Sequence, residues 1–158
     1  MRAMLAFILA VACSANAQTT RTLGVLSEVS KDDADNLACG VSQPEIEAIA
    51  TLAMQKSGIA SGEPANAFGP YLYLNPTTIF NPTYRVCVTS LHISVRAMVQ
   101  NAQLGAPYLG TFKSRSGSAD IFFCSTETLY TAGQDSSKGK LLFEVERNVK
   151  LCLDKMEF

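Results

Sequence analysis

The chain has 158 residues, of which 47% are apolar and 17% charged, and its formal net charge is −1. That length is enough to bury one hydrophobic core, and the composition excludes a disordered or collagen-like chain. A net charge this close to zero gives no electrostatic support for binding nucleic acid or an anionic membrane surface. We therefore expect one folded domain and no nucleic-acid partner.

Residues 1–17 have the layout of a secretory signal peptide. Arg2 is followed by the nine-residue apolar run Met4–Ala12 and by the small-x-small pattern Ala15–Ala17. The run is far shorter than the ~20 residues that span a bilayer, so we expect no transmembrane segment in the mature chain. Cleavage at that point leaves residues 18–158 as a single α+β domain that is periplasmic or secreted.

A second processing pattern overlaps the first. Residues 9–13, Leu-Ala-Val-Ala-Cys, resemble a bacterial lipoprotein signal in which Cys13 would carry the lipid. Under this alternative the mature chain is anchored to a membrane by lipid, whereas signal-peptide cleavage after Ala17 removes Cys13 altogether.

Four cysteines lie beyond residue 17, and an even number in an exported chain indicates two disulfides. They are Cys39, Cys87, Cys124 and Cys152. Their spacings are far wider than those of zinc ligands, and no Cys-x-x-Cys motif is present, so we expect neither a metal site nor thiol exchange. The chain also lacks the glycine-rich dinucleotide motif and the Walker motif, so we expect no cofactor.

The first elements after the signal peptide are a weak strand pattern at Leu23–Val29 and a charged turn at Lys31–Asn36. The acidic residues of that turn lack the Asp-x-Asp-x-Asp-Gly spacing of a calcium loop. We therefore interpret the segment as a solvated turn.

A helix is predicted over residues 43–57. Ser42 and Glu45 have the Ser-x-x-Glu spacing of a capping box, and apolar residues then recur every three or four positions. Gly58 is typical of the position after a helix, where Ile59 can supply the apolar contact of a Schellman motif.

The middle of the chain changes to the two-residue period of β-strands. The alternation predicts strands at residues 71–80, 85–99, 108–113 and 119–131. Asn81-Pro82-Thr83 joins the first two as a hairpin. Pro76 cannot donate to a ladder and so indicates an edge strand or a bulge within the first of them.

The strand at 85–99 has two different faces. Its odd positions from Cys87 onward are mostly apolar and form a core face, whereas its even positions include Ser90, His92 and Ser94. This alternation is typical of a half-buried strand in an antiparallel sheet.

A second helix is predicted near the end of the chain. Asp135, Ser136 and Ser137 are candidate N-caps, and the first helical residues lie near Lys138. Apolar residues recur at helical spacing over four turns. They are Leu142, Val145, Val149, Cys152 and Met156.

These elements predict an α+β fold, a two-layer sandwich. A three- to four-stranded antiparallel sheet carries both helices on one face, because each helix has one apolar stripe and the long strand has one apolar face. The opposite sheet face is then partly open to solvent.

The order of the elements predicts the disulfide pairing. If the strands alternate in direction, Cys39 and Cys87 lie at the same end of the sheet. At ~1.5 Å per helical residue and ~3.3 Å per strand residue, Cys124 and Cys152 lie at similar heights. We therefore predict Cys39–Cys87 and Cys124–Cys152. One pattern opposes this pairing, because the apolar odd positions of the last strand would turn Cys124 outward unless a bulge shifts the alternation.

The open sheet face is where we expect binding. Tyr71, Tyr73, His92 and Arg96 all belong to it, and aromatic residues and arginine are favoured anchors at interfaces. The expected function is therefore a non-catalytic binding or envelope-assembly role with an extracellular or envelope protein or ligand as partner.

A small secreted hydrolase is the alternative. It would use His92, the only histidine, or a carboxylate pair such as Glu127 with Asp120. No Gly-x-Ser-x-Gly or His-Glu-x-x-His motif accompanies these residues. A closed pocket holding His92 within hydrogen-bond reach of a serine or carboxylate would favour this alternative, and a flat sheet face would favour binding.

The chain also resembles known exported proteins. A helix ending in Lys56-Ser57-Gly58-Ile59, then Pro70-Tyr71-Leu72-Tyr73-Leu74-Asn75, a long alternating strand and a C-terminal amphipathic helix resemble small exported bacterial proteins of unknown function. The element order over residues 42–157 also resembles the amino-terminal domain of the Tol-system periplasmic protein. The resemblance implies a bacterial envelope setting and a non-catalytic role, and it assigns no functional residue.

Overall fold

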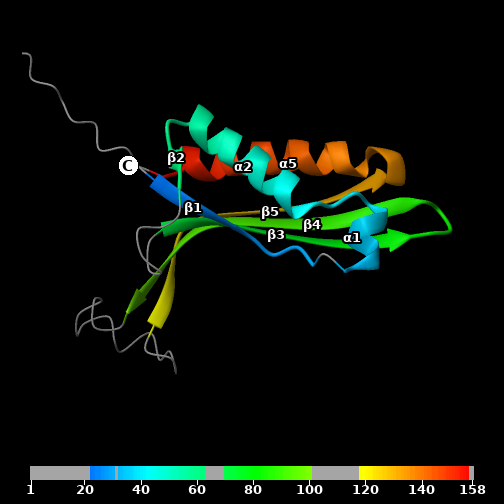
Figure 1. The fold of residues 1–158 in the computed structure, drawn as a ribbon, viewed down its shortest axis with the longest axis horizontal. Helices are drawn as coiled ribbons and strands as arrows, with labels where there is room; N and C mark the ends of the chain where they lie inside the picture. The colour runs from blue at the N-terminus through cyan, green and yellow to red at the C-terminus, as the bar shows by residue number, and fades with distance from the viewer. Residues whose placement is uncertain (1–21, 31, 63–69, 101–117, 157–158) are drawn as a thin grey trace, which may run out of the picture.

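A mixed β-sheet with two long helices on one side forms the body of the protein in a computed structural model (Figure 1). The structure describes residues 22–30, 32–62, 70–100 and 118–156. Those ranges contain five strands and three helices, and the sheet order is β2-β1-β3-β4-β5. The elements are β1 (Thr22–Ser27), α1 (Ala34–Ala38), α2 (Gln43–Lys56), β2 (Ala60–Ser61), β3 (Pro70–Asn81), β4 (Val86–Gln100), β5 (Ser118–Gly133) and α5 (Gln134–Asp154).

The N-terminal strand corrects the expected sheet. β1 pairs in parallel with both β2 and β3, so the sheet is mixed and larger than the predicted three- to four-stranded antiparallel one. Parallel pairing needs a long crossover, and α1 and α2 supply it between β1 and β3. The short alternating pattern of β1 predicted a strand, but it did not indicate which strands β1 pairs with or whether the pairing is parallel.

The charged turn contains a short helix that the sequence analysis did not predict. Asp33 is the N-cap of α1, and its carboxylate accepts hydrogen bonds from the backbone N–H groups of Asp35 at 2.8 Å and Asn36 at 3.2 Å. An acidic side chain in this position satisfies two of the free N–H groups at a helix start. The carboxylate of Asp33 therefore caps the short helix α1 and stabilises its first turn.

Helix α2 matches its prediction within one residue, and its C-terminal end follows the expected motif. Gly58 has φ +75°, and the N–H groups of Gly58 and Ile59 donate to the carbonyls of Gln55 and Met54, both at 3.0 Å. At the N-terminus Ser42 is the N-cap residue, but its side chain makes no capping hydrogen bond. The predicted capping box is therefore wrong.

The β3–β4 hairpin is present as predicted. Its antiparallel ladder runs from Pro70 opposite Ala97 to Asn81 opposite Val86. Pro76 lies beyond the last residue of β3 that pairs with β1, so among the described strands β3 pairs at that point with β4 alone. A residue without an N–H fits such a position.

The last strand contains the bulge on which the predicted pairing of Cys124 depended, and the last helix begins earlier than predicted. In the β4–β5 ladder Val95 faces Cys124 and Arg96 faces Phe122, so Phe123 is an extra residue in β5. This bulge shifts the alternation and turns Cys124 toward the helices. Helix α5 begins at Gln134 with Gly133 as N-cap, about a turn earlier than expected from Asp135–Ser137.

Two disulfides join the helical layer to the sheet. Cys39, at the end of α1, is bonded to Cys87 of β4, and Cys124 of β5 is bonded to Cys152 of α5. These are the same pairs that the element order predicted. Their sulfur atoms lie in the core, with Cys39, Cys87 and Cys152 almost fully buried.

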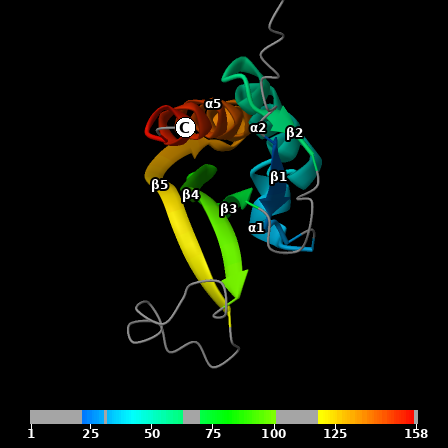
Figure 2. The ribbon, with the colours of Figure 1, turned by 90° about the vertical axis from the view of Figure 1, so that its left-hand side faces the viewer.

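The hydrophobic core lies between the sheet and helices α2 and α5, which lie side by side on one face (Figures 1 and 2). The odd positions of β4 from Cys87 to Ala97 are buried in it, as predicted. Alternate residues of β3, including Leu72 and Leu74, face the same way. The predicted apolar stripe of α5 is largely correct, although Leu141 and Leu153 also belong to it.

Several sequence-based expectations lie outside the described residues. They concern the signal peptide at 1–17, the lipid site at Cys13 and the strand at 108–113. Among the helices of the described ranges, none combines the length and apolar character needed to cross a membrane.

Candidate functional site: the outer sheet face

The sheet face opposite α2 and α5, which we call the outer face, carries the candidate binding residues. Figure 2 shows that neither long helix lies on this side. Exposed apolar side chains occur toward both of its ends, and serine, histidine and glutamate occupy its middle. Residues of this face include Leu26, Glu28, Tyr71, Tyr73, Ile79, Ser90, His92, Ser94, Arg96, Phe122, Ser125, Glu127 and Leu129.

Arg96 is held in place between two aromatic rings. Its guanidinium carbon lies 3.6 Å from the centre of the Tyr73 ring and 5.0 Å from that of Phe122. Its Nε donates a hydrogen bond of 2.7 Å to Oγ of Ser94, a side chain with no exposed surface. Stacking and this hydrogen bond fix the plane of the guanidinium, a geometry suited to bidentate recognition of a carboxylate.

No carboxylate within the described ranges lies at ion-pair distance from Arg96. The hydrogen bond to Ser94 uses Nε, and the rings cover the guanidinium without hydrogen bonding to its terminal N–H groups. Arg96 is therefore an ordered cation on a face that no long helix covers.

Tyr73 is buried although it lies on the outer face. Only 7% of its surface is exposed, because Arg96 and the ring of His92 pack against it, the latter at 6.4 Å between centroids. Its hydroxyl donates to the carboxylate of Glu28. Burial, followed by that hydrogen bond and the negative charge of Glu28, raises the pKa of Tyr73 above its ordinary value. Tyr73 therefore stays neutral at physiological pH.

His92 lies in the middle of the outer face, as predicted, and contacts a serine. Its Nε2 is 3.0 Å from Oγ of Ser125, and Glu127 is its neighbour across the ladder. A serine and a histidine at this distance are the first requirement of nucleophilic catalysis. However, Ser125 stands between Cys124 and Thr126 and lacks the Gly-x-Ser-x-Gly turn that exposes a nucleophilic serine beside an oxyanion hole.

The carboxylate pair considered for a glycosidase is too widely separated. Asp120 and Glu127 are seven residues apart on the same strand, which places their backbones about 20 Å apart at ~3.3 Å per residue. Glycosidase carboxyl groups lie within ~10 Å of each other. This arrangement does not support that chemistry.

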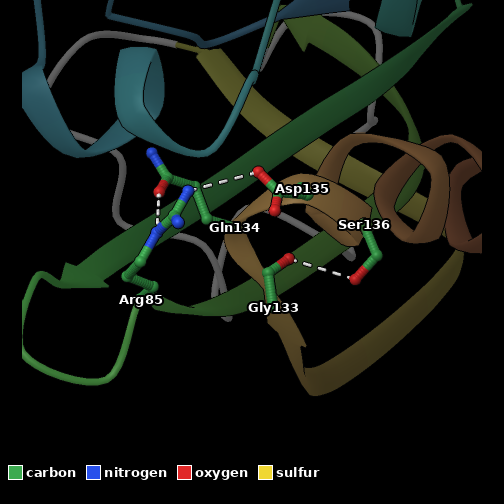
Figure 3. Close-up of a pocket in the computed structure, with 5 residues that line it drawn as sticks. All are labelled: Arg85, Gly133, Gln134, Asp135 and Ser136. Carbon is green, nitrogen blue, oxygen red and sulfur yellow. Dashed lines mark hydrogen bonds and ion pairs between the residues drawn. The ribbon is translucent and has the colours of Figure 1, made fainter.

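A shallow pocket of about 370 Å³ lies away from these residues, where β4 begins and β5 passes into α5 (Figure 3). Its lining consists of Arg85, Gly133, Gln134, Asp135 and Ser136 and does not include His92. Arg85 donates to Gln134 at 3.1 Å and to Asp135 at 3.4 Å, and Ser136 donates to the carbonyl of Gly133 at 3.1 Å. The side chain of Arg85 is thus bonded to those of Gln134 and Asp135, whereas Ser136 bonds to the backbone. Arg85, whose φ is +50°, ties the hairpin to the start of α5.

One buried carboxylate lies on the helical side and has a structural role. Glu144 of α5 pairs with Lys140 at 2.8 Å and with Arg147 at 3.2 Å. Asn148 donates to the Glu144 carbonyl at 2.8 Å and accepts from Thr128 of β5 at 3.1 Å. These bonds join α5 to β5. Within the described part of the chain, no three His, Cys, Asp or Glu residues are grouped so as to hold a metal ion.

Among the four residues predicted from the sequence, His92 and Arg96 each pack against the ring of Tyr73. Tyr71 lies opposite Arg96 in the ladder and is half-buried. Sequence reasoning missed Glu28 and Phe122, because a parallel strand brings the first and a bulge turns the second outward.

Comparisons with known proteins identify no family. No family model matches the chain, and no curated protein matches it. Among solved structures, a minor lipoprotein from Acinetobacter baumannii aligns with 85% of this chain and 86% of its own, at 7% identity and a TM-score of 0.35. A likeness of that size is too small for any conclusion about this chain.

Proposed function

We propose that this chain is a non-catalytic, extracytoplasmic binding protein, and that its outer face takes an acidic segment of a partner protein at Arg96. The observation that carries the proposal is the ordered guanidinium of Arg96, stacked on Tyr73 and bonded to Ser94 without a carboxylate partner among the described residues. Because the guanidinium is already ordered, a carboxylate binds without the entropic cost of fixing the side chain.

The surroundings of Arg96 support a protein partner. Leu26 and Phe122, close to the Tyr73–Arg96 stack, are about half exposed and offer apolar contact beside the charge. An arginine and aromatic residues within an apolar rim are the composition of an interface hot spot. The two disulfides support an oxidising compartment, as the proposed signal peptide requires.

A pair of photo-crosslinking positions tests this function. Leu26 on the outer face and Leu151 on α5 have similar exposure, 48% and 42%, and each is replaced by benzoyl-phenylalanine in the host cell. We expect a discrete adduct from position 26, with the crosslinked peptide rich in Asp and Glu. Arg96→Ala should remove it and Arg96→Lys should weaken it, because lysine lacks the bidentate fork. An adduct that survives Arg96→Ala, or that forms equally from position 151, contradicts the proposal.

The contact between His92 and Ser125 favours a hydrolase as the second candidate. A fluorophosphonate probe distinguishes the two functions, since it labels only an activated serine. Under the binding proposal the probe leaves Ser125 unlabelled. Labelling of Ser125 that His92→Ala abolishes would establish the hydrolase instead.

A further inference from the structure

The outer face carries one ionisable ring that the binding site proposed at Arg96 leaves unused. His92 and Arg96 lie on the same side of β4, and both side chains pack against the ring of Tyr73. The guanidinium carbon of Arg96 is 3.6 Å from the centre of that ring, and the centre of the His92 ring is 6.4 Å from it. The two groups are therefore separated by no more than the sum of these distances.

The half-buried His92 ring has one nitrogen in contact with a serine and one that faces elsewhere. Its Nε2 is 3.0 Å from Oγ of Ser125. An imidazolium donates from both nitrogens, and its two N–H groups point in divergent directions. With Nε2–H directed at Ser125, Nδ1–H is directed away from this contact, and no hydrogen bond joins Nδ1 to another of the described residues. Nδ1–H is thus a donor for a ligand.

The charged groups around His92 come from the strands on both sides. Glu127 of β5 faces His92 across the ladder and is exposed. On the β3 side Tyr73 packs against the ring, and its hydroxyl donates to the carboxylate of Glu28, directly after β1. With Arg96 these groups make one cation and two carboxylates, an excess of negative charge that opposes an acidic ligand. A proton on His92 removes that excess, and histidine is the side chain that commonly gains a proton between pH 8 and pH 5.

We propose that protonated His92 is a second anchor for the acidic segment that binds at Arg96, so that binding strengthens as the pH falls. This inference rests on the proposed function. In an extended segment, side chains two residues apart point the same way and lie about 7 Å apart. Two acidic residues separated by one residue can therefore place one carboxylate on the fork of Arg96 and the other on Nδ1–H of His92. Both contacts are charge-assisted hydrogen bonds.

Nuclear magnetic resonance tests the proposal directly, because the chain has a single histidine and its imidazole proton signals belong to His92 alone. Protein without a histidine tag is titrated with the capped peptide Ala-Ala-Asp-Ala-Asp-Ala-Ala at pH 7.5 and pH 5.5. We expect the affinity to be roughly fivefold higher at pH 5.5, where the aspartates of the peptide are still ionised. By linkage, saturating peptide should move the midpoint of the His92 titration upward. Equal affinities, or an unmoved midpoint, overturn the proposal.

Three variants separate the charge of His92 from its packing. His92→Gln keeps a polar side chain beside Ser125 but cannot gain a proton, so the increase at pH 5.5 should disappear. Glu127→Gln removes the carboxylate that faces His92 and should tighten binding of the peptide. Asp154→Asn on α5 is its matched control, because it changes the net charge equally at an exposed position away from the outer face. An increase that persists in His92→Gln, or equal effects of the two charge variants, overturns the proposal.

A second peptide tests the spacing of the two anchors. In Ala-Ala-Asp-Asp-Ala-Ala-Ala the charge is the same, but an extended segment points the two carboxylates to opposite sides. We expect this peptide to bind without the increase at pH 5.5, and an equal increase overturns the two-anchor geometry. Arg96→Ala distinguishes the two proposals. Undiminished binding by this variant overturns the proposed function together with this inference, whereas binding that needs Arg96 but is equal at both pH values overturns the role of His92 alone.

Discussion

The two faces of strand β4 have opposite chemistry within a single run of alternating residues. Toward the helices its residues are buried and, apart from Thr89, apolar, and a disulfide at Cys87 ties this side to α1. Toward the outside they are serine, histidine and arginine, and there Tyr73 and Ser94 are buried by other side chains of the same face. The helix-facing side therefore stabilises the fold through burial in the core, whereas on the outer side only the residues around Tyr73 and Ser94 are buried.

Removal of the disulfides should give the largest loss of stability, since both disulfides lie on the helix-facing side of the sheet. Replacing Cys39 and Cys87 by serine should cost about 4 kcal/mol, and replacing Cys124 and Cys152 about 3.5 kcal/mol, from the loop-entropy model for separations of 48 and 28 residues. Urea unfolding of the paired variants measures both. A larger loss for the shorter loop would show that native-state packing outweighs chain entropy.

Adjacent residues of β4 give the sharpest single-residue contrast. Leu91 is fully buried and faces the helices, whereas His92 is half-buried and faces outward. We expect Leu91→Ala to lower the free energy of unfolding by ~2–5 kcal/mol, because it leaves a cavity. His92→Ala should lower it by less than about 1 kcal/mol. Chemical denaturation of the two variants measures the ratio, and equal losses would remove the distinction between the faces.

Two buried tyrosines extend the comparison to alkaline pH. Burial raises the pKa of Tyr130 on the helix-facing side to about 12, and the negative charge of Glu144 adds to the rise. The folded state therefore holds this proton between pH 10 and pH 12, where the unfolded state has lost it, so stability falls across that range. The loss is on the order of 2–3 kcal/mol for a shift of about two pH units.

Tyr130→Phe should remove that part of the alkaline loss while leaving the fall caused by Tyr73. At pH 7 the variant should be at least as stable as the parent, because the buried Tyr130 hydroxyl has no hydrogen-bond partner within the described ranges. Urea midpoints measured from pH 7 to pH 12 give both quantities. Parallel curves for parent and variant would show that Tyr130 does not titrate with the unfolding transition.

Local sequence patterns predicted the structural features that depend on residues close together in the chain. The two faces of β4, the hairpin and the end of α2 at Gly58 follow from two-residue and helical periods and from glycine chemistry. The outer-face positions of Tyr73, His92 and Arg96 follow from the same alternation. The structure places them in contact, which no spacing in the sequence specifies.

What the sequence did not predict depends on distant pairing. Leu26 and Glu28 approach Tyr73 only because β1 pairs in parallel with β3. The crossover through α1 and α2 makes this parallel pairing possible. Phe122 approaches Arg96 because one extra residue in β5 resets the alternation. Ser42 has the right spacing for a capping box, yet Glu45 bonds to Lys138 of α5 at 2.5 Å. Tertiary contact there outweighs a local preference.

The two disulfides join cysteines in the order in which they occur, first with second and third with fourth. In a chain that crosses a membrane from its N-terminus, Cys87 is the first new thiol that Cys39 meets, and Cys152 the first that Cys124 meets. An oxidant that links thiols as they emerge therefore produces the native bonds directly. Neither of the other two pairings of these four thiols arises this way, so under the proposed export the native disulfides would form without slow reshuffling of wrong ones.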